Sequence, residues 1–187
     1  MKVNFGGLDI AQRVDNTSLQ TIQLNDGTLE QIGEKTWPHI DFGLITRDVE
    51  KINRLEKYNR IHYDKTGQGE LARKVFSPEI PLYGVQLSLP RKLAIITLMR
   101  AFFNQKKLII HDRELYRELL EQEEHITDAG NRLYRHPEGF HDDRFWAFGL
   151  AVDAAATYMK MIPKYTAAVA KKPKSVDDEI EEYVRYV

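Results

Sequence analysis

The order of strand-like and helix-like segments constrains the fold of this chain more than any other feature of its sequence. An Asn-Asp-Gly turn at 25–27 joins the second of three strand-like stretches to the third. After it, helical spacing alternates with short strand-like runs. The predicted strands are 3–11, 17–24, 28–37, 60–63, 83–87 and 108–110, with a two-stranded excursion at 125–136, and the predicted helices are 42–55, 70–76, 91–103, 112–123 and 140–161. An antiparallel meander followed by strand–helix units predicts an α/β domain, with a mixed sheet and helices on both of its faces.

The length, net charge and cysteine content of the chain exclude several classes of protein. A chain of 187 residues is long enough for one domain with a sizeable core. Its 27 basic and 28 acidic residues give a net charge of −1, which excludes a globally basic nucleic-acid coat protein but leaves room for a local basic groove. The chain has no Cys, so disulfides, thiolate zinc sites and Cys nucleophiles are excluded.

The ends of the chain indicate its compartment and its domain boundary. No apolar run approaches the ~18 residues of a membrane span, and the N-terminus lacks a signal-peptide core. We therefore expect a cytoplasmic protein without a membrane partner. The composition changes after Pro163 to a basic and then an acidic stretch. This change predicts a domain over 1–163 and a tail or short helix over 164–187.

Acidic residues stand at three informative places. Asp9 lies inside the first apolar strand, where a charge is costly unless it is paired or bound to a cation. Asp64 ends the fourth strand, just before a Gly-rich turn, where open α/β sheets place ligand groups. Asp142 and Asp143 open the last apolar helix. If the first and fourth strands are neighbours, these carboxylates converge, and a hard cation such as Mg²⁺ or Mn²⁺ would neutralise them.

Each acidic position also has a purely structural interpretation. Asp9 could be a strand-edge residue with a Lys or Arg partner, and Asp64 could satisfy amides in a turn. Asp142 and Asp143 could cap a helix and complement its dipole. Taken one residue at a time, these interpretations remain open. The occurrence of all three positions in this topological order favours a metal site.

Four motifs together resemble the nuclease domain of the large terminase subunit of tailed double-stranded DNA phages, which has a ribonuclease H-like fold. The resemblance covers roughly residues 3–160, and its motifs are Gly7-Leu8-Asp9-Ile10-Ala11 followed by Asp15, Tyr63-Asp64-Lys65-Thr66-Gly67-Gln68-Gly69-Glu70, Val85-Gln86-Leu87-Ser88 followed by Lys92, and His141-Asp142-Asp143. A full large terminase also has an ATPase motor, but this chain has no G-x-x-x-x-G-K-[ST] motif. Translocation therefore cannot belong to these residues.

The resemblance implies a metal-dependent endonuclease that cuts double-stranded, concatemeric viral DNA with little sequence specificity during genome packaging. In that mechanism Asp9, Asp64 and Asp143 or Asp142 hold two Mg²⁺ or Mn²⁺ ions ~4 Å apart. Asp15, His141 and Glu70 are expected to surround these ligands. The implied partners are DNA, an ATPase motor domain, a portal and a small terminase subunit, in a host-cell cytoplasm. The alternatives are a Holliday-junction resolvase or another ribonuclease H-like nuclease, and a non-catalytic DNA-binding or assembly module.

Basic residues near the expected site are candidates for contacts with DNA phosphates. Lys92 is the strongest, because it falls in the first turn of a helix after the fifth strand. The others are Lys65, Arg73 and Lys74. Each of them could equally be ordinary surface charge. Phosphate contacts would bind DNA without reading its sequence.

Overall fold

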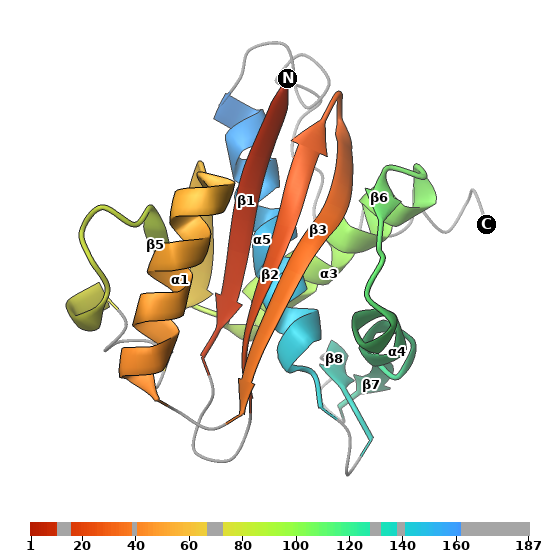
Figure 1. The fold of residues 1–187 in the computed structure, drawn as a ribbon. Helices are drawn as coiled ribbons and strands as arrows, with labels where there is room; N and C mark the ends of the chain where they lie inside the picture. The colour runs from red at the N-terminus through yellow and green to blue at the C-terminus, as the bar shows by residue number, and fades with distance from the viewer. Residues whose placement is uncertain (11–15, 39–40, 67–72, 128–131, 138–140, 162–187) are drawn as a thin grey trace.

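A six-stranded mixed sheet forms the centre of the protein (Figure 1). The computed structural model describes residues 1–10, 16–38, 41–66, 73–127, 132–137 and 141–161. The strands of the sheet are β1 (Lys2–Asp9), β2 (Asn16–Asn25), β3 (Thr28–Pro38), β4 (Arg60–Asp64), β5 (Leu82–Val85) and β6 (Leu108–Ile109). They lie in the order β5-β4-β1-β2-β3-β6. Strands β1, β2 and β3 are antiparallel, whereas β4, β5 and β6 pair in parallel with their neighbours.

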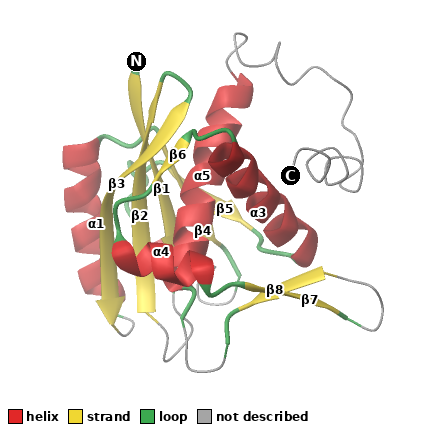
Figure 2. Cartoon of the chain, turned by 90° about the vertical axis from the view of Figure 1, so that its right-hand side faces the viewer, coloured by secondary structure: helices red, strands yellow, loops and turns green. Residues whose placement is uncertain are grey.

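Helices cover both faces of this sheet, which confirms the predicted fold class (Figures 1 and 2). The helices with both ends in the described residues are α1 (Phe42–Glu56), α3 (Leu89–Asn104), α4 (Arg113–Leu120) and α5 (Asp143–Met161). Of the predicted helix at 70–76, residues 73–75 are helical and 70–72 lie outside the described residues. Helix α1 lies on one face, while α5 and α3 lie behind the other (Figure 1). A separate hairpin of β7 (Glu123–Ile126) and β8 (Arg132–Arg135) confirms the predicted two-stranded excursion.

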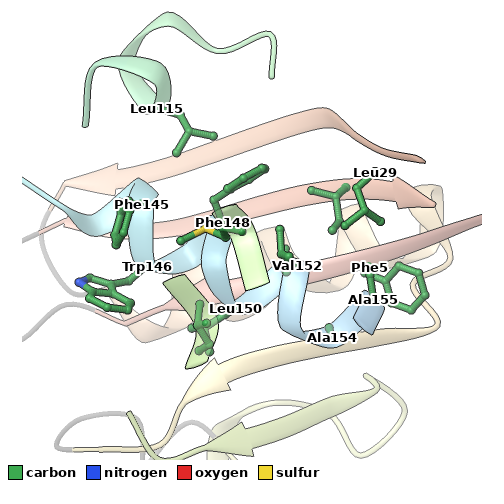
Figure 3. Packing of buried hydrophobic residues seen from close by; sticks show 14 of the residues in the cluster. Phe5, Leu29, Leu115, Phe145, Trp146, Phe148, Leu150, Val152, Ala154 and Ala155 are labelled. Carbon is green, nitrogen blue, oxygen red and sulfur yellow. The ribbon is translucent and has the colours of Figure 1, made fainter. Parts of the chain in front are cut away.

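Alternation along the strands divides the core between the two faces. Leu8 and Ile61 pack with α1, in a cluster that includes Ile45 and Val49. Phe5, on the opposite side of β1, packs into the larger cluster around α5. The α5 residues of that cluster include Phe148 and Val152, and Figure 3 shows them between the sheet and the neighbouring helices. Side chains that alternate with Leu8 and Ile61 therefore face α5.

Helix α5 approaches the sheet closely because β1 carries a glycine where the two elements cross. A Cβ atom at Gly7 would lie 1.9 Å from the carbonyl oxygen of Ala147 and 2.3 Å from the amide nitrogen of Ala151. Both of those atoms belong to the α5 backbone, which a side-chain movement cannot relieve. The Gly6-Gly7 pair thus allows a close backbone approach, with Gly7 as the residue in contact.

Several predicted elements are shorter in the structure. Strand β5 ends at Val85 rather than at residue 87, and β6 ends at Ile109 rather than at residue 110. Helix α5 begins at Asp143 rather than at residue 140, because Asp142 precedes the first turn as a capping residue. Helix α4 ends at Leu120 rather than near 123, because the chain enters β7 at Glu123. Strand β1 ends at Asp9 rather than at residue 11. The predicted tail at 164–187 lies outside the described residues. Within the described part of the chain, no helix is both long and apolar enough to cross a membrane.

Candidate active site

Asp9 and Asp64 end two neighbouring parallel strands. Strand β1 pairs with β4 in a register that places Leu8 beside Tyr63, so the two aspartates follow at the same edge of the sheet. Leu8 and Tyr63 belong to the core on the α1 side. Alternation therefore turns Asp9 and Asp64 toward the α5 side. This pairing confirms the condition under which the sequence predicted that the two carboxylates would converge.

Asp143 approaches the same edge from the first turn of α5. Its side chain is buried, with only 8% of the residue exposed. The backbone amide of Asn16, at the start of β2, donates to Asp143 Oδ2 over 3.3 Å, and Nδ1 of His141 lies 3.8 Å from the same oxygen. A carboxylate in a first helical turn is also favoured by the helix dipole. Burial and the hydrogen bond from Asn16 hold the Asp143 carboxylate in place.

The side chain of Asp142 has different hydrogen-bond partners from that of Asp143. Its Oδ2 accepts a hydrogen bond of 2.8 Å from Nε1 of Trp146, and its backbone carbonyl accepts from the Trp146 amide. Nε2 of His136 lies 3.8 Å from the other carboxylate oxygen. The sequence could not divide the roles of two adjacent aspartates. The geometry favours Asp142 as the cap that fixes the start of α5 and leaves Asp143 as the better placed metal ligand.

The pKa of Asp9 reflects the negative charges gathered at this edge. Desolvation raises the pKa of Asp9 well above its ordinary value of 3.8, and the negative charges of Asp143, Asp64 and Asp142 raise it further. Lys92 opposes these effects by lowering the Asp9 pKa. The carboxylates are thus close enough to repel one another, although they come from three different parts of the chain. A hard divalent cation is the ligand whose charge and oxygen preference match such a set.

Asp64 also serves the turn that follows it. Its two carboxylate oxygens accept hydrogen bonds from the backbone amide of Thr66 at 3.0 Å and from the Thr66 hydroxyl at 2.7 Å. The interpretation of Asp64 as a turn residue is therefore supported by the geometry. The same bonds orient the carboxylate, and an ionised carboxylate has lone pairs left for a cation.

The candidate ligands do not form a finished metal cage. In the ranges that the structure describes, no three His, Asp or Glu side chains make up a group that could hold an ion as they stand. Asp15 and Glu70, which were expected to surround the ligands, lie outside the described residues. The ligand set remains a prediction, supported by the shared sheet edge, by the burial of Asp143 and by the coupling of Asp9 to three other carboxylates.

Lys92 is the basic candidate that the structure brings to this site. It lies in the first turns of α3, and its Nζ is 4.4 Å from the centre of the Trp146 ring. Trp146 in turn donates to Asp142, so α3 and α5 meet through these side chains. Lys65, Arg73 and Lys74 are exposed and follow β4. Their role at a DNA surface remains a prediction.

Sequence reasoning missed two charged groups beside the site. Arg135 of β8 lines a pocket of about 310 Å³ together with Lys92 and Trp146. Glu118 of α4 is buried and accepts a 2.9 Å hydrogen bond from the amide of Phe145, and desolvation raises its pKa to about 7. Arg135 stood in a hairpin rich in charges, and Glu118 in a strongly amphipathic helix. In neither case did the sequence offer a signal that distinguishes a site residue from surface charge.

This chain is similar in sequence to one protein family and in structure to several solved nuclease domains. A family model described as terminase RNaseH-like domain matches residues 6–155. The large terminase nuclease from thermophilic phage G20c superposes with a TM-score of 0.70 at 15% identity, covering 81% of this chain and 82% of that one. The same nuclease with bound magnesium gives a TM-score of 0.67 at 17% identity, covering 81% of each chain.

Longer proteins contain the same fold. The HK97 bacteriophage large terminase superposes with a TM-score of 0.67 at 14% identity, over 81% of this chain and 39% of that chain. A search of curated proteins by sequence finds no match. At these identities the structural likeness establishes the ribonuclease H-like fold, while the family match covers most of the described residues.

Proposed function

This chain belongs to the terminase RNaseH-like domain family, and from that premise we propose that it is a metal-dependent endonuclease domain that cuts double-stranded DNA during viral genome packaging. The proposed nuclease domain spans 1–163, and 164–187 is proposed as a C-terminal tail or short helix. The observation that carries the proposal is the parallel register of β1 and β4, which brings Asp9 and Asp64 to the same edge of the sheet, where the buried Asp143 accepts a hydrogen bond from the start of β2. A relative of the same fold has been determined with bound magnesium and also with bound cobalt.

The residues fit a divalent cation because the donors are carboxylate oxygens whose mutual repulsion a cation would relieve. Asp9, Asp64 and Asp143 would hold Mg²⁺ or Mn²⁺, two ions in the full mechanism. Bound ions supply an activated water and stabilise the departing 3′ oxygen in phosphodiester hydrolysis. The Asn16 amide keeps the Asp143 carboxylate in place, and His141 lies 3.8 Å from the same oxygen. Asp142 fixes the start of α5.

DNA is expected to bind through its phosphates. Lys92 and Arg135 place two positive charges at the pocket beside the carboxylates. A chain with a net charge of −1 can offer only such local contacts. We expect binding in the range of about 1–100 μM that falls steeply with salt and is insensitive to sequence. In the HK97 large terminase the corresponding region is one part of a longer chain. An attached motor would raise the effective concentration of DNA at the site.

Plasmid nicking tests the proposal. Supercoiled plasmid should be nicked and then linearised in Mn²⁺ or Mg²⁺, with no preferred site, and excess EDTA should abolish the reaction. Linear duplex, a four-way junction and an RNA–DNA hybrid should be offered in competition at equal concentrations. We expect the linear duplex to be cut no more slowly than the junction or the hybrid. Selective cleavage of the junction or hybrid would favour a resolvase or another ribonuclease H-like nuclease. DNA binding without cleavage in any metal would favour an assembly module.

A further inference from the structure

Helix α5 carries a second buried carboxylate, Asp153, further along the helix than Asp143. It is flanked in the helix by Val152 and Ala154, which are fully buried. A carboxylate among apolar neighbours is costly unless donors satisfy it. The side chain of Asp153 is 9% exposed, so water cannot supply most of those donors. The interactions that hold this charge must therefore come from the protein.

Two side chains from other elements meet one oxygen of Asp153. Nδ1 of His62, in β4, lies 2.8 Å from Asp153 Oδ2, and the His62 side chain is only 5% exposed. Nη2 of Arg91, in α3, donates to the same oxygen over 2.5 Å. Burial alone would raise the pKa of Asp153, but the hydrogen bond from His62 and the charge of Arg91 outweigh it and hold the pKa below its ordinary value. Asp153 is thus a satisfied, ionised group.

These three residues belong to the elements that carry the candidate site. His62 stands two positions before Asp64 in β4, so both face α5. Arg91 directly precedes Lys92 in α3. Asp153 lies in the helix that begins with Asp143. One carboxylate oxygen therefore joins β4, α3 and α5, the three elements that carry Asp64, Lys92 and Asp143.

We propose that Asp153 is a positioning residue for the metal site: with His62 and Arg91 it fixes β4 and α3 against α5, and so sets the separation of Asp64, Lys92 and Asp143. This inference rests on the proposed function. Stability alone is a weak reason for such a group, since well-packed apolar residues often replace a buried ion pair without loss. Hydrogen bonds fix the relative orientation of the elements they join, whereas apolar packing does not. Partners that orient metal ligands typically change metal affinity about 10–100-fold when mutated.

The test compares three variants of the whole chain by Mn²⁺ titration, with free Mn²⁺ followed by electron paramagnetic resonance. Asp153→Asn removes the charge, and Arg91→Gln removes one partner at a partly exposed position. Asp48→Asn is the matched control, because Asp48 accepts a 3.0 Å hydrogen bond from Trp37 and likewise joins a strand to a helix, but on the α1 face. We expect the Mn²⁺ dissociation constant to rise about tenfold in the first two variants and to stay unchanged in the control.

The double variant sharpens the result. If Asp153 and Arg91 act through one network, Asp153→Asn with Arg91→Gln should weaken Mn²⁺ binding by much less than the product of the two single effects. Thermal unfolding measured in parallel separates stability from positioning, because a merely structural role would lower the melting temperature and leave the Mn²⁺ affinity of the folded protein at about 20 °C unchanged.

Each outcome decides the proposal. Wild-type Mn²⁺ affinity in folded Asp153→Asn and Arg91→Gln proteins would overturn it while leaving the proposed function intact. If Asp153→Asn does not fold, Arg91→Gln decides alone, since Arg91 reaches the network from a partly exposed position. If the wild-type chain binds no Mn²⁺, the proposed function fails, and the positioning role fails with it.

Discussion

Replacing Asp9 with Asn is expected to abolish DNA cleavage while making the metal-free protein more stable. The variant keeps the shape of the side chain but removes a charge that would bind the cation. We expect plasmid nicking to fall about a thousandfold or more, as when a member of a catalytic set is removed. Asp41→Asn is the control, because Asp41 caps α1 through the amide of Leu44 and Asn caps a helix about as well as Asp. Nicking by Asp9→Asn at the wild-type rate would remove Asp9 from the mechanism.

The gain in stability should depend on pH in a defined direction. Desolvation and three neighbouring negative charges raise the pKa of Asp9 in the folded state. The free energy of unfolding is therefore not reduced by Asp9 below pH 3.8, the ordinary pKa of the group, where Asp9 is protonated in both states. As the pH rises from there toward the pKa of Asp9 in the folded protein, the free energy of unfolding decreases. Asn mimics the protonated form, so urea unfolding in EDTA should find the variant more stable than wild type at about pH 8, and the difference should shrink as the pH falls toward about 4. A variant less stable than wild type in the alkaline buffer would contradict this account of the charges.

Replacing Gly7 with Ala is expected to cost most of the stability of the fold. The added Cβ would fall 1.9 Å and 2.3 Å from backbone atoms of α5, so the helix itself would have to move away from β1. Overpacking that the backbone must absorb lies at the severe end of single substitutions, and we expect a loss of about 4 kcal/mol or more in the free energy of unfolding. Urea denaturation followed by circular dichroism measures it.

Gly33→Ala is the matched control for this prediction. Gly33 also lies within a strand of the central sheet, but a Cβ there would meet the Thr21 side chain at 3.6 Å, an ordinary contact. We expect the free energy of unfolding of Gly33→Ala to lie within about 1 kcal/mol of the wild-type value. If Gly7→Ala were equally mild, the close approach of α5 to β1 would not be a determinant of the fold.

The order of elements could be predicted because each segment shows its own periodicity. The paired arrangement of Asp9 and Asp64 also followed from the sequence, once β1 and β4 were assumed to be neighbours, and their observed register satisfies that condition. The ends of elements were less accessible. Helix α4 stops at Leu120 because the hairpin begins shortly afterwards, and the helical pattern itself contains no such signal.

The separate roles of the polar residues in and around the site could not be predicted from the sequence. Asp142 and Asp143 are adjacent and chemically identical, and the contact of Asp142 with Trp146 is what distinguishes them. Asp153 lies in the almost wholly apolar middle of α5, where the sequence shows an isolated charge without its partners. His62 and Arg91 reach it from distant parts of the chain. Long-range contacts between single polar residues leave no periodic trace.

We expect the edge of the sheet formed by Asp9, Asp64 and the start of α5 to bind divalent cations. The most direct measurement is an anomalous difference map from a crystal soaked in Mn²⁺. A peak should appear between Asp9 and Asp143, within bonding distance of carboxylate oxygens, and it should be lost in crystals of Asp9→Asn. Peaks confined to exposed groups such as His111 or His125, with none at the carboxylates, would contradict it.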